Sequence, residues 1–237
     1  RKETENTKIV TKEDKSGIEI YVKDDTKFES IHIPVILTES GLTDTVYNDF
    51  YIGKNANVVI VAGCGIHNDH HEDSSHNGIH RFFLGEGSTV KYVENHYGEG
   101  EGTGKRILNP VTEITLEDGA VFEMETTQIK GVDSTVRITK ADLASNTNLV
   151  VKEILMTHDD QFASTEFELN LNGEKASANL TSRAVAIDNS KQSFVSRVYG
   201  NAECFSHVSC DAIIKDNAKV TSIPEITFPN AAYSPSR

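Results

Sequence analysis

The chain of 237 residues contains no tryptophan, two methionines and only 7% aromatic residues. A core built from this composition must consist mainly of small and β-branched side chains. No apolar run approaches the roughly 18 residues that a membrane-spanning helix requires. The first residues, RKETENTKIVTKED, lack the apolar centre of a signal peptide. These absences predict a soluble protein of the cytoplasm.

Cysteine and positive charge are also scarce. Three cysteines form an odd set in a chain of this length, which does not suit a disulfide framework. Asp and Glu outnumber Lys and Arg by 36 to 23, so the formal net charge is −13. Such a chain repels phosphate backbones and anionic membrane surfaces. We therefore expect neither a nucleic acid nor a membrane among its partners.

Short segments in which apolar and polar residues alternate are abundant. Examples are IEIYV, NVVIVAG, VTEITL and FELNL. They are rich in Val, Ile, Thr and Phe and have a period of two, which is typical of β-strands. Long helical patterns are scarce, so the sequence predicts an all-β fold with few helices.

A turn followed by a strand recurs along the chain. In IGKNANVVIV, LGEGSTVKYV and LEDGAVFEME, a turn with Gly or Asn precedes a small residue and then an alternating segment. The small residues Ala56, Ser88 and Ala120 are 32 positions apart, and later copies are spaced less evenly. Gly and Asn suit a corner with positive φ. The repetition therefore favours a β-solenoid of stacked coils over a β-sandwich.

The domain organisation expected from these patterns is simple. Residues 17–228 form one β-helix core domain. Residues 1–16 are a lead-in segment, and residues 229–237 are an irregular tail.

The stretch CFSHVSCD holds two of the three cysteines and a histidine. Strand alternation places Cys204 and Cys210 on one face and Glu203 and His207 on the other. In a straight strand the two cysteines would lie about 20 Å apart, at ~3.3 Å per residue, so they could not bind the same metal ion. Both also fit inward-facing core positions, because a buried free cysteine behaves as a small hydrophobic residue.

Residues 63–80, GCGIHNDHHEDSSHNGIH, hold the third cysteine and five of the nine histidines. The candidate metal ligands are Cys64, His67, His76 and His80. This density of His, Asp and Glu suits a divalent or ferrous ion. No HExxH or CxxC spacing occurs, so a solvated acidic loop between two strands explains the pattern equally well.

Five longer strings resemble the SufB/SufD family of iron–sulfur cluster assembly scaffolds. They are GCGIHND, HNGIHRFFLG, VKYVENHYGEGEGTGKRILNPVTEI, METTQIKGVDST and CFSHVSCDAIIKDNAKVTSIPEI. The strings run in the family's order from about residue 60 to residue 226. The resemblance is closest to the short SufB-like members, or to a core fragment of the family.

This resemblance implies a right-handed parallel β-helix that carries a transient iron–sulfur cluster, with iron as its metal. It implies three kinds of partner: a SufC-type ABC ATPase, a sulfur-donating system, and a second β-helix from a homodimer or a SufD-like protein. The chain would then be a scaffold and not an enzyme, because the ATPase hydrolyses the ATP.

The resemblance also assigns roles to residues. Cys210 matches the thiolate that the family uses for cluster assembly, near an interface where ligands from two protomers meet. Cys204, His207 and Glu203 lie beside it as possible helpers. Two other interpretations stay open: a β-helix metal-binding enzyme that uses the region from His67 to His80, and a purely structural β-solenoid that binds partners.

Overall fold

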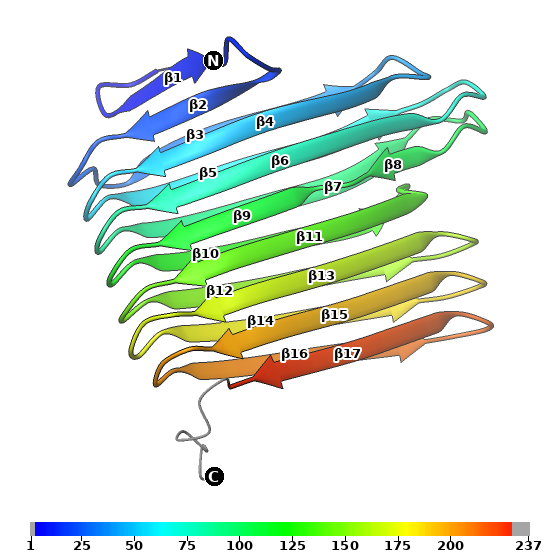
Figure 1. Ribbon diagram of the computed structural model, residues 1–237. Coiled ribbons are helices and arrows are strands. Elements are labelled where there is room, and N and C mark those ends of the chain that lie inside the picture. Colours follow the sequence, from blue (N-terminus) through cyan, green and yellow to red (C-terminus); the bar gives the residue numbers. More distant parts are fainter. Residues whose placement is uncertain (1–2, 229–237) are drawn as a thin grey trace.

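The computed structural model describes residues 3–228 and shows a solenoid of about seven turns (Figure 1). Each full turn contributes one strand to each of two sheets, which face each other across the core. No helix occurs among residues 3–228, and hence none that could cross a bilayer. The predicted all-β fold of stacked parallel coils is confirmed.

The strands divide between the two sheets as follows. The ten-stranded sheet consists of β1 (Thr7–Thr11), β2 (Gly17–Val22), β4 (Thr43–Ile52), β6 (Ser74–Leu84), β8 (Arg106–Leu108), β9 (Val111–Leu116), β11 (Ser134–Leu143), β13 (Phe162–Leu171), β15 (Lys191–Gly200) and β17 (Lys219–Thr227). The seven-stranded sheet consists of β3 (Glu29–Leu37), β5 (Asn57–His67), β7 (Thr89–Glu99), β10 (Val121–Lys130), β12 (Asn148–Thr157), β14 (Ser177–Ala186) and β16 (Phe205–Ile214).

Pairing follows the winding of the chain. β1 and β2 pair antiparallel, and the other paired strands of the described chain are parallel. β8 and β9 both pair with β6 and β11, and the break between them falls at Asn109 and Pro110. Proline has no N–H to donate to a ladder, so the strand is interrupted there.

One corner of the solenoid repeats from coil to coil. Its small residues are fully buried: Ala56, Ser88, Ala120, Thr147 and Ala176. Ahead of the first three stand Asn55, Gly87 and Gly119, with φ of 54°, 67° and 73°. Each of their N–H groups donates to a carbonyl of the next coil, at 2.9 Å in all three cases. The predicted corner, a left-handed residue followed by a small inward one, is therefore present.

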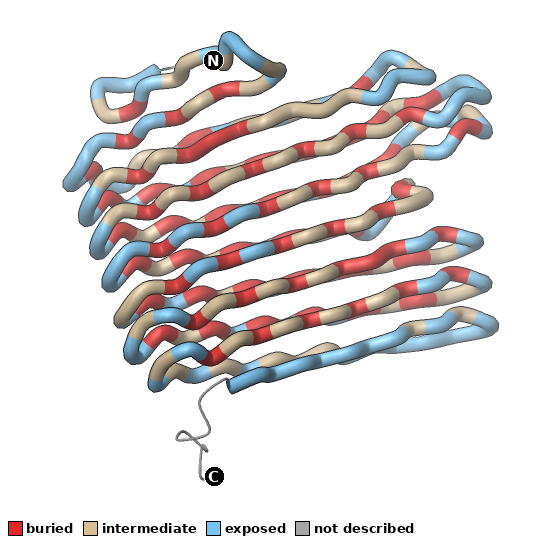
Figure 2. Tube along the Cα trace, viewed as in Figure 1, coloured by how far each residue is buried: buried red, intermediate tan, exposed pale blue. Residues whose placement is uncertain are grey.

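Alternate residues of every strand fill the interior, whose core extends from Ile18 to Val198. Burial falls sharply at the last coil, where most residues of β16 and β17 are exposed (Figure 2). Within the expected lead-in of residues 1–16, Thr7–Thr11 form β1 and pair with β2. The expected tail, residues 229–237, lies outside the described residues.

Candidate functional site

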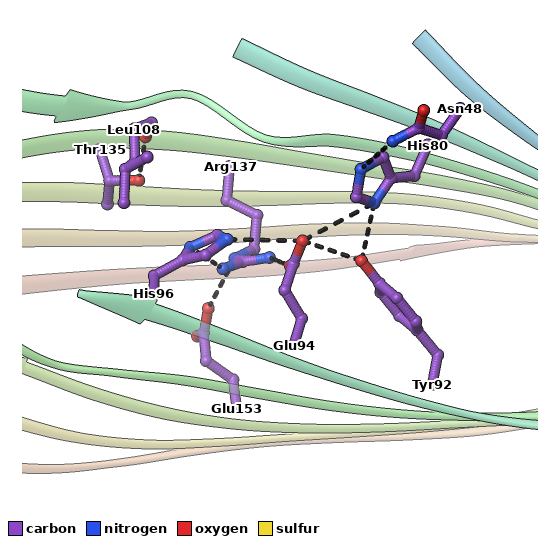
Figure 3. A network of polar contacts seen from close by, with 9 residues as sticks. All are labelled: Asn48, His80, Tyr92, Glu94, His96, Leu108, Thr135, Arg137 and Glu153. Carbon is purple, nitrogen blue, oxygen red and sulfur yellow. Dashed lines mark hydrogen bonds and ion pairs between the residues drawn. The ribbon is translucent and has the colours of Figure 1, made fainter. Parts of the chain in front are cut away.

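Strand β7 carries a row of polar side chains into the core. Tyr92, Glu94 and His96 alternate along the strand, face the interior and are buried. A buried carboxylate is costly unless it is paired. Its partner comes from the facing sheet: Arg137 of β11 donates from Nη1 to Glu94 Oε2 at 2.7 Å and from Nη2 to His96 Nδ1 at 2.9 Å (Figure 3).

A chain of hydrogen bonds leads from the N-terminal coils to the same carboxylate. Tyr92 donates its hydroxyl to Glu94 Oε1 at 2.9 Å, so its oxygen accepts from His80 Nδ1 at 2.7 Å. His80 Nε2 then accepts from the Asn48 amide at 3.4 Å. These partners fix the tautomer of His80 and leave Glu94 as the acceptor at the end of the chain.

The charges of this network follow from burial and pairing. Burial alone would raise the pKa of Glu94, but the Arg137 guanidinium, bonded to it at 2.7 Å, holds it well below its ordinary value. Burial lowers the pKa of both His80 and His96 although Glu94 opposes the shift. At neutral pH the interior therefore contains an ionised Glu94, a charged Arg137 and two neutral histidines.

The polar row continues toward the last coil. One inward position of successive strands, matched in register from β7 to β16, is occupied by Glu94, Thr126, Glu153, Ser182 and Cys210. Glu153 accepts from Thr165 Oγ1 at 2.8 Å and from Ser182 Oγ at 2.7 Å, and it lies 3.8 Å from Arg137 Nε. Cys210 is thus the last member of a column of polar side chains inside the solenoid.

Cys210 is partly buried and packs against the core, as strand alternation predicts. The hydroxyls of Ser222, on β17, and Ser182 contact its thiol. Burial raises the pKa of Cys210, and the two hydroxyls only partly oppose that shift. The thiol is therefore protonated at neutral pH.

The other residues of the stretch CFSHVSCD have different surroundings. Cys204 packs against the core and precedes Phe205, whose N–H donates to the Ala176 carbonyl at 3.0 Å. It therefore takes the corner position that small residues occupy in earlier coils. Glu203 and His207 are exposed. Within the described chain, no cluster of three ligating side chains includes any of these residues or Cys210.

The histidine-rich region is not one loop. β5 ends at His67 and β6 begins at Ser74, so the prediction of a loop is wrong for residues 63–67 and 74–80. Along residues 74–80, buried and partly buried side chains alternate, as they do in a strand with one face in the core. His76 and His80 are buried, and His76 Nδ1 contacts Asp44 Oδ2 at 3.0 Å. The side chain of His67 is 45% exposed and pairs with Asp69 at 2.8 Å.

Within the described chain, no cluster of three ligating side chains contains more than one of the four candidate metal ligands of that region. Cys64 points into the core, where its thiol meets Glu94 and His96. Sequence reasoning did not select either partner, nor Arg137 or Glu153. Strand parity alone could have found Glu94 and His96, because they share the inward parity of Val90.

These environments predict how the thiols react. We expect Cys204 and Cys210 to be alkylated by iodoacetamide in the native protein, and buried Cys64 only after unfolding. Because burial raises the pKa of Cys210, its alkylation rate should keep rising above about pH 8.5, where an exposed thiol is half ionised. Mass spectrometry of alkylated peptides across a pH series measures both effects. Rapid native labelling of Cys64 would contradict the burial described above.

A protein-family model described as the SUF system FeS cluster assembly SufBD core domain matches residues 66–234. That span includes Cys210 and the buried network from His80 to Glu153, but not Asn48. The chain belongs to the SufBD family. The resemblance seen in the sequence is thereby confirmed.

Curated relatives carry the same family name. An iron–sulfur cluster assembly SufBD family protein of Methanocaldococcus jannaschii is 25% identical over 216 residues, which cover 86% of this chain and 65% of the relative. A SufBD family protein of Pyrococcus horikoshii is 27% identical over 229 residues, covering 94% of this chain and 68% of the relative. This SufBD chain therefore spans about two thirds of the length of these relatives.

Proposed function

We propose that this SufBD chain is a scaffold on which sulfur and iron are assembled into a transient cluster, and that it is not itself an enzyme. The observation that carries the proposal is Cys210, a thiol at the accessible end of an interior polar column. Membership in a family of iron–sulfur cluster assembly proteins supports it. Neither of the other thiols combines accessibility with polar neighbours in this way.

The surroundings of Cys210 suit the binding of sulfur or iron. The thiolate is the form that attacks sulfur donors and binds iron. Ser182 donates its hydroxyl to Glu153, so Ser222 is the hydroxyl that can donate to a Cys210 thiolate. The Glu153 charge disfavours a free thiolate, but it attracts a cation that arrives to replace the proton.

One thiolate does not complete the coordination of a cluster iron, which is tetrahedral. We propose that the other ligands come from a second copy of the chain or from a SufD-like partner at the last coil. There β16 and β17 each form the last edge of a sheet, and edge strands attract further strands. Phe205 and Ile213 are 64% and 68% exposed at this coil. A SufC-type ATPase and a sulfur-donating system are the further partners.

Anaerobic reconstitution with ferrous iron and sulfide tests this function. The parent protein should gain the visible absorption of sulfur-to-iron charge transfer, and Cys210→Ser should lose most of it. Cys204→Ser is the matched control, because it removes a partly buried thiol from the same coil and should behave as the parent. Equal absorption by Cys210→Ser and the parent would contradict the proposal that Cys210 is the thiolate on which the cluster assembles.

A further inference from the structure

We infer that the interior of the solenoid contains a site for a single divalent transition-metal ion of the Fe²⁺, Co²⁺ and Zn²⁺ class, formed by Cys64, Glu94 and His96. The site lies near the N-terminal end of the polar column, whereas Cys210 lies at its other end. The inference goes beyond the cluster scaffold proposed above and does not depend on it.

The geometry of the three side chains supports coordination of one ion. Cys64 of β5 and His96 of β7 are direct register partners in neighbouring strands. Glu94 stands two residues before His96 and therefore faces the same interior. One ligand atom of each, a sulfur, an oxygen and a nitrogen, lies within 4.8 Å of the other two, and all three residues are buried. Thiolate, imidazole and carboxylate are a ligand set that such ions accept.

The second observation is a buried nitrogen without a partner. His96 Nε2 makes no hydrogen bond with any residue that the structure describes, and its distance of 3.4 Å to Glu94 Oε1 is too long for a good one. A buried polar atom in this condition costs free energy unless something binds it. An ion between His96, Glu94 and Cys64 would satisfy it.

The charges of the neighbourhood suit a dication. The carboxylates of Glu94 and Glu153 contribute two negative charges and Arg137 contributes one positive charge. Coordination requires Cys64 as a thiolate, with its proton released to solvent, which adds a third negative charge. The four side chains then sum to −2, and a divalent ion brings the buried cluster to neutrality.

Binding requires one local change. In the metal-free protein His96 Nδ1 accepts from Arg137, so the proton of the neutral ring is on Nε2. Coordination through Nε2 moves that proton to Nδ1, and the Arg137 contact with the ring is lost. The guanidinium keeps its 2.7 Å bond to Glu94 and can turn toward Glu153, which is 3.8 Å away.

Cobalt titration of the reduced chain of 237 residues tests the site. In the Cys204→Ser/Cys210→Ser protein, Cys64 is the remaining thiol. Co²⁺ supplied to the native protein, or during refolding because the site is buried, should bind with one-to-one stoichiometry. It should give a thiolate-to-cobalt charge-transfer band and the strong d–d bands of four-coordinate cobalt, and Zn²⁺ should remove them.

Single substitutions in the parent chain assign the ligands. Cys64→Ser should lose the part of the charge-transfer absorption that arises from the interior site. His96→Gln should weaken cobalt binding by at least about tenfold. His67→Gln is the matched control, because it changes an exposed histidine at the end of the same strand as Cys64, and it should leave cobalt binding unchanged. If His96→Gln does not fold, the loss of absorption in Cys64→Ser alone decides whether the interior site binds cobalt.

Absence of a charge-transfer band from the protein with Cys64 as its remaining thiol would overturn the inference. Unchanged cobalt affinity and unchanged d–d bands after Cys64→Ser in the Cys204→Ser/Cys210→Ser background would overturn it as well. Neither outcome bears on the reconstitution test of Cys210, which is read from iron–sulfur absorption in the parent chain.

Discussion

Replacement of Arg137 by methionine is expected to lower the free energy of unfolding by about 3–5 kcal/mol. Arg137 is buried and bonds directly to Glu94 and His96. Methionine fills a similar volume but leaves the Glu94 carboxylate in the core without its cation, and removal of one partner from a buried ion pair is strongly destabilising. Urea unfolding followed by circular dichroism measures the loss.

The matched control for Arg137→Met is Arg197→Met. Arg197 also lies on the ten-stranded sheet and pairs with Glu225 at 3.1 Å, but both side chains are well exposed, at 41% and 52%. Its loss should cost at most about 1 kcal/mol. The double change Arg137→Met/Glu94→Gln should recover part of the stability, because it also removes the stranded charge. Equal effects of the two arginine substitutions would show that the buried network contributes no special stability.

Phe82→Ala is expected to cost a similar amount, about 3–5 kcal/mol. The Phe82 ring is fully buried, stacks on Phe50 at 4.4 Å between ring centroids, and contacts Phe122 at 5.0 Å. Its removal leaves a cavity between rings that are themselves packed in the core, and such a cavity adds to the cost of the lost apolar contacts. Thermal and urea unfolding of the variant measure the effect.

The next residue in the chain is the control for Phe82. Phe83 points to the outer face of β6 and stacks on Tyr51 at 5.0 Å, where it is only partly buried. Phe83→Ala should cost clearly less than Phe82→Ala, since no enclosed cavity forms. If the two substitutions destabilised the protein equally, the assignment of inner and outer faces in β6 would be wrong.

The fold could be predicted from the sequence because its rules are local. Period-two alternation marks the strands, and the left-handed corner residues before Ala56, Ser88 and Ala120 mark the repeat. The same spacing appears in the structure as direct register, with Asn57 opposite Thr89 and Thr89 opposite Val121. The coils shorten further along, to 27 residues between Val121 and Asn148, so the repeat is harder to detect there.

The interior site could not be predicted in the same way, because it depends on contacts between coils. Glu94 and Arg137 are 43 positions apart and meet only because their strands lie in opposite sheets. In residues 74–80, the sequence has polar residues at positions that face inward. Without knowledge of their partners, such residues suggest a loop and not a strand. Their partners, such as Asp44 for His76, lie in another coil and make the strand possible.

Cys204 and Cys210 show what strand alternation predicts and what only the stacking of coils reveals. Alternation places both thiols inward, as the structure confirms. Alternation cannot tell them apart, but the stacking of coils can. It puts Cys204 in a corner column of small residues, and it puts Cys210 in a column with Glu153 and Ser182.

Mössbauer spectroscopy tests most directly whether Cys210 is the thiolate on which a cluster assembles. The parent, Cys204→Ser and Cys210→Ser proteins would each be reconstituted anaerobically with isotopically enriched iron and sulfide. We predict the quadrupole doublet of sulfur-coordinated cluster iron in the parent and in Cys204→Ser, and its loss from Cys210→Ser. The same doublet at full intensity in Cys210→Ser would contradict the role of Cys210 as the cluster-assembling thiolate.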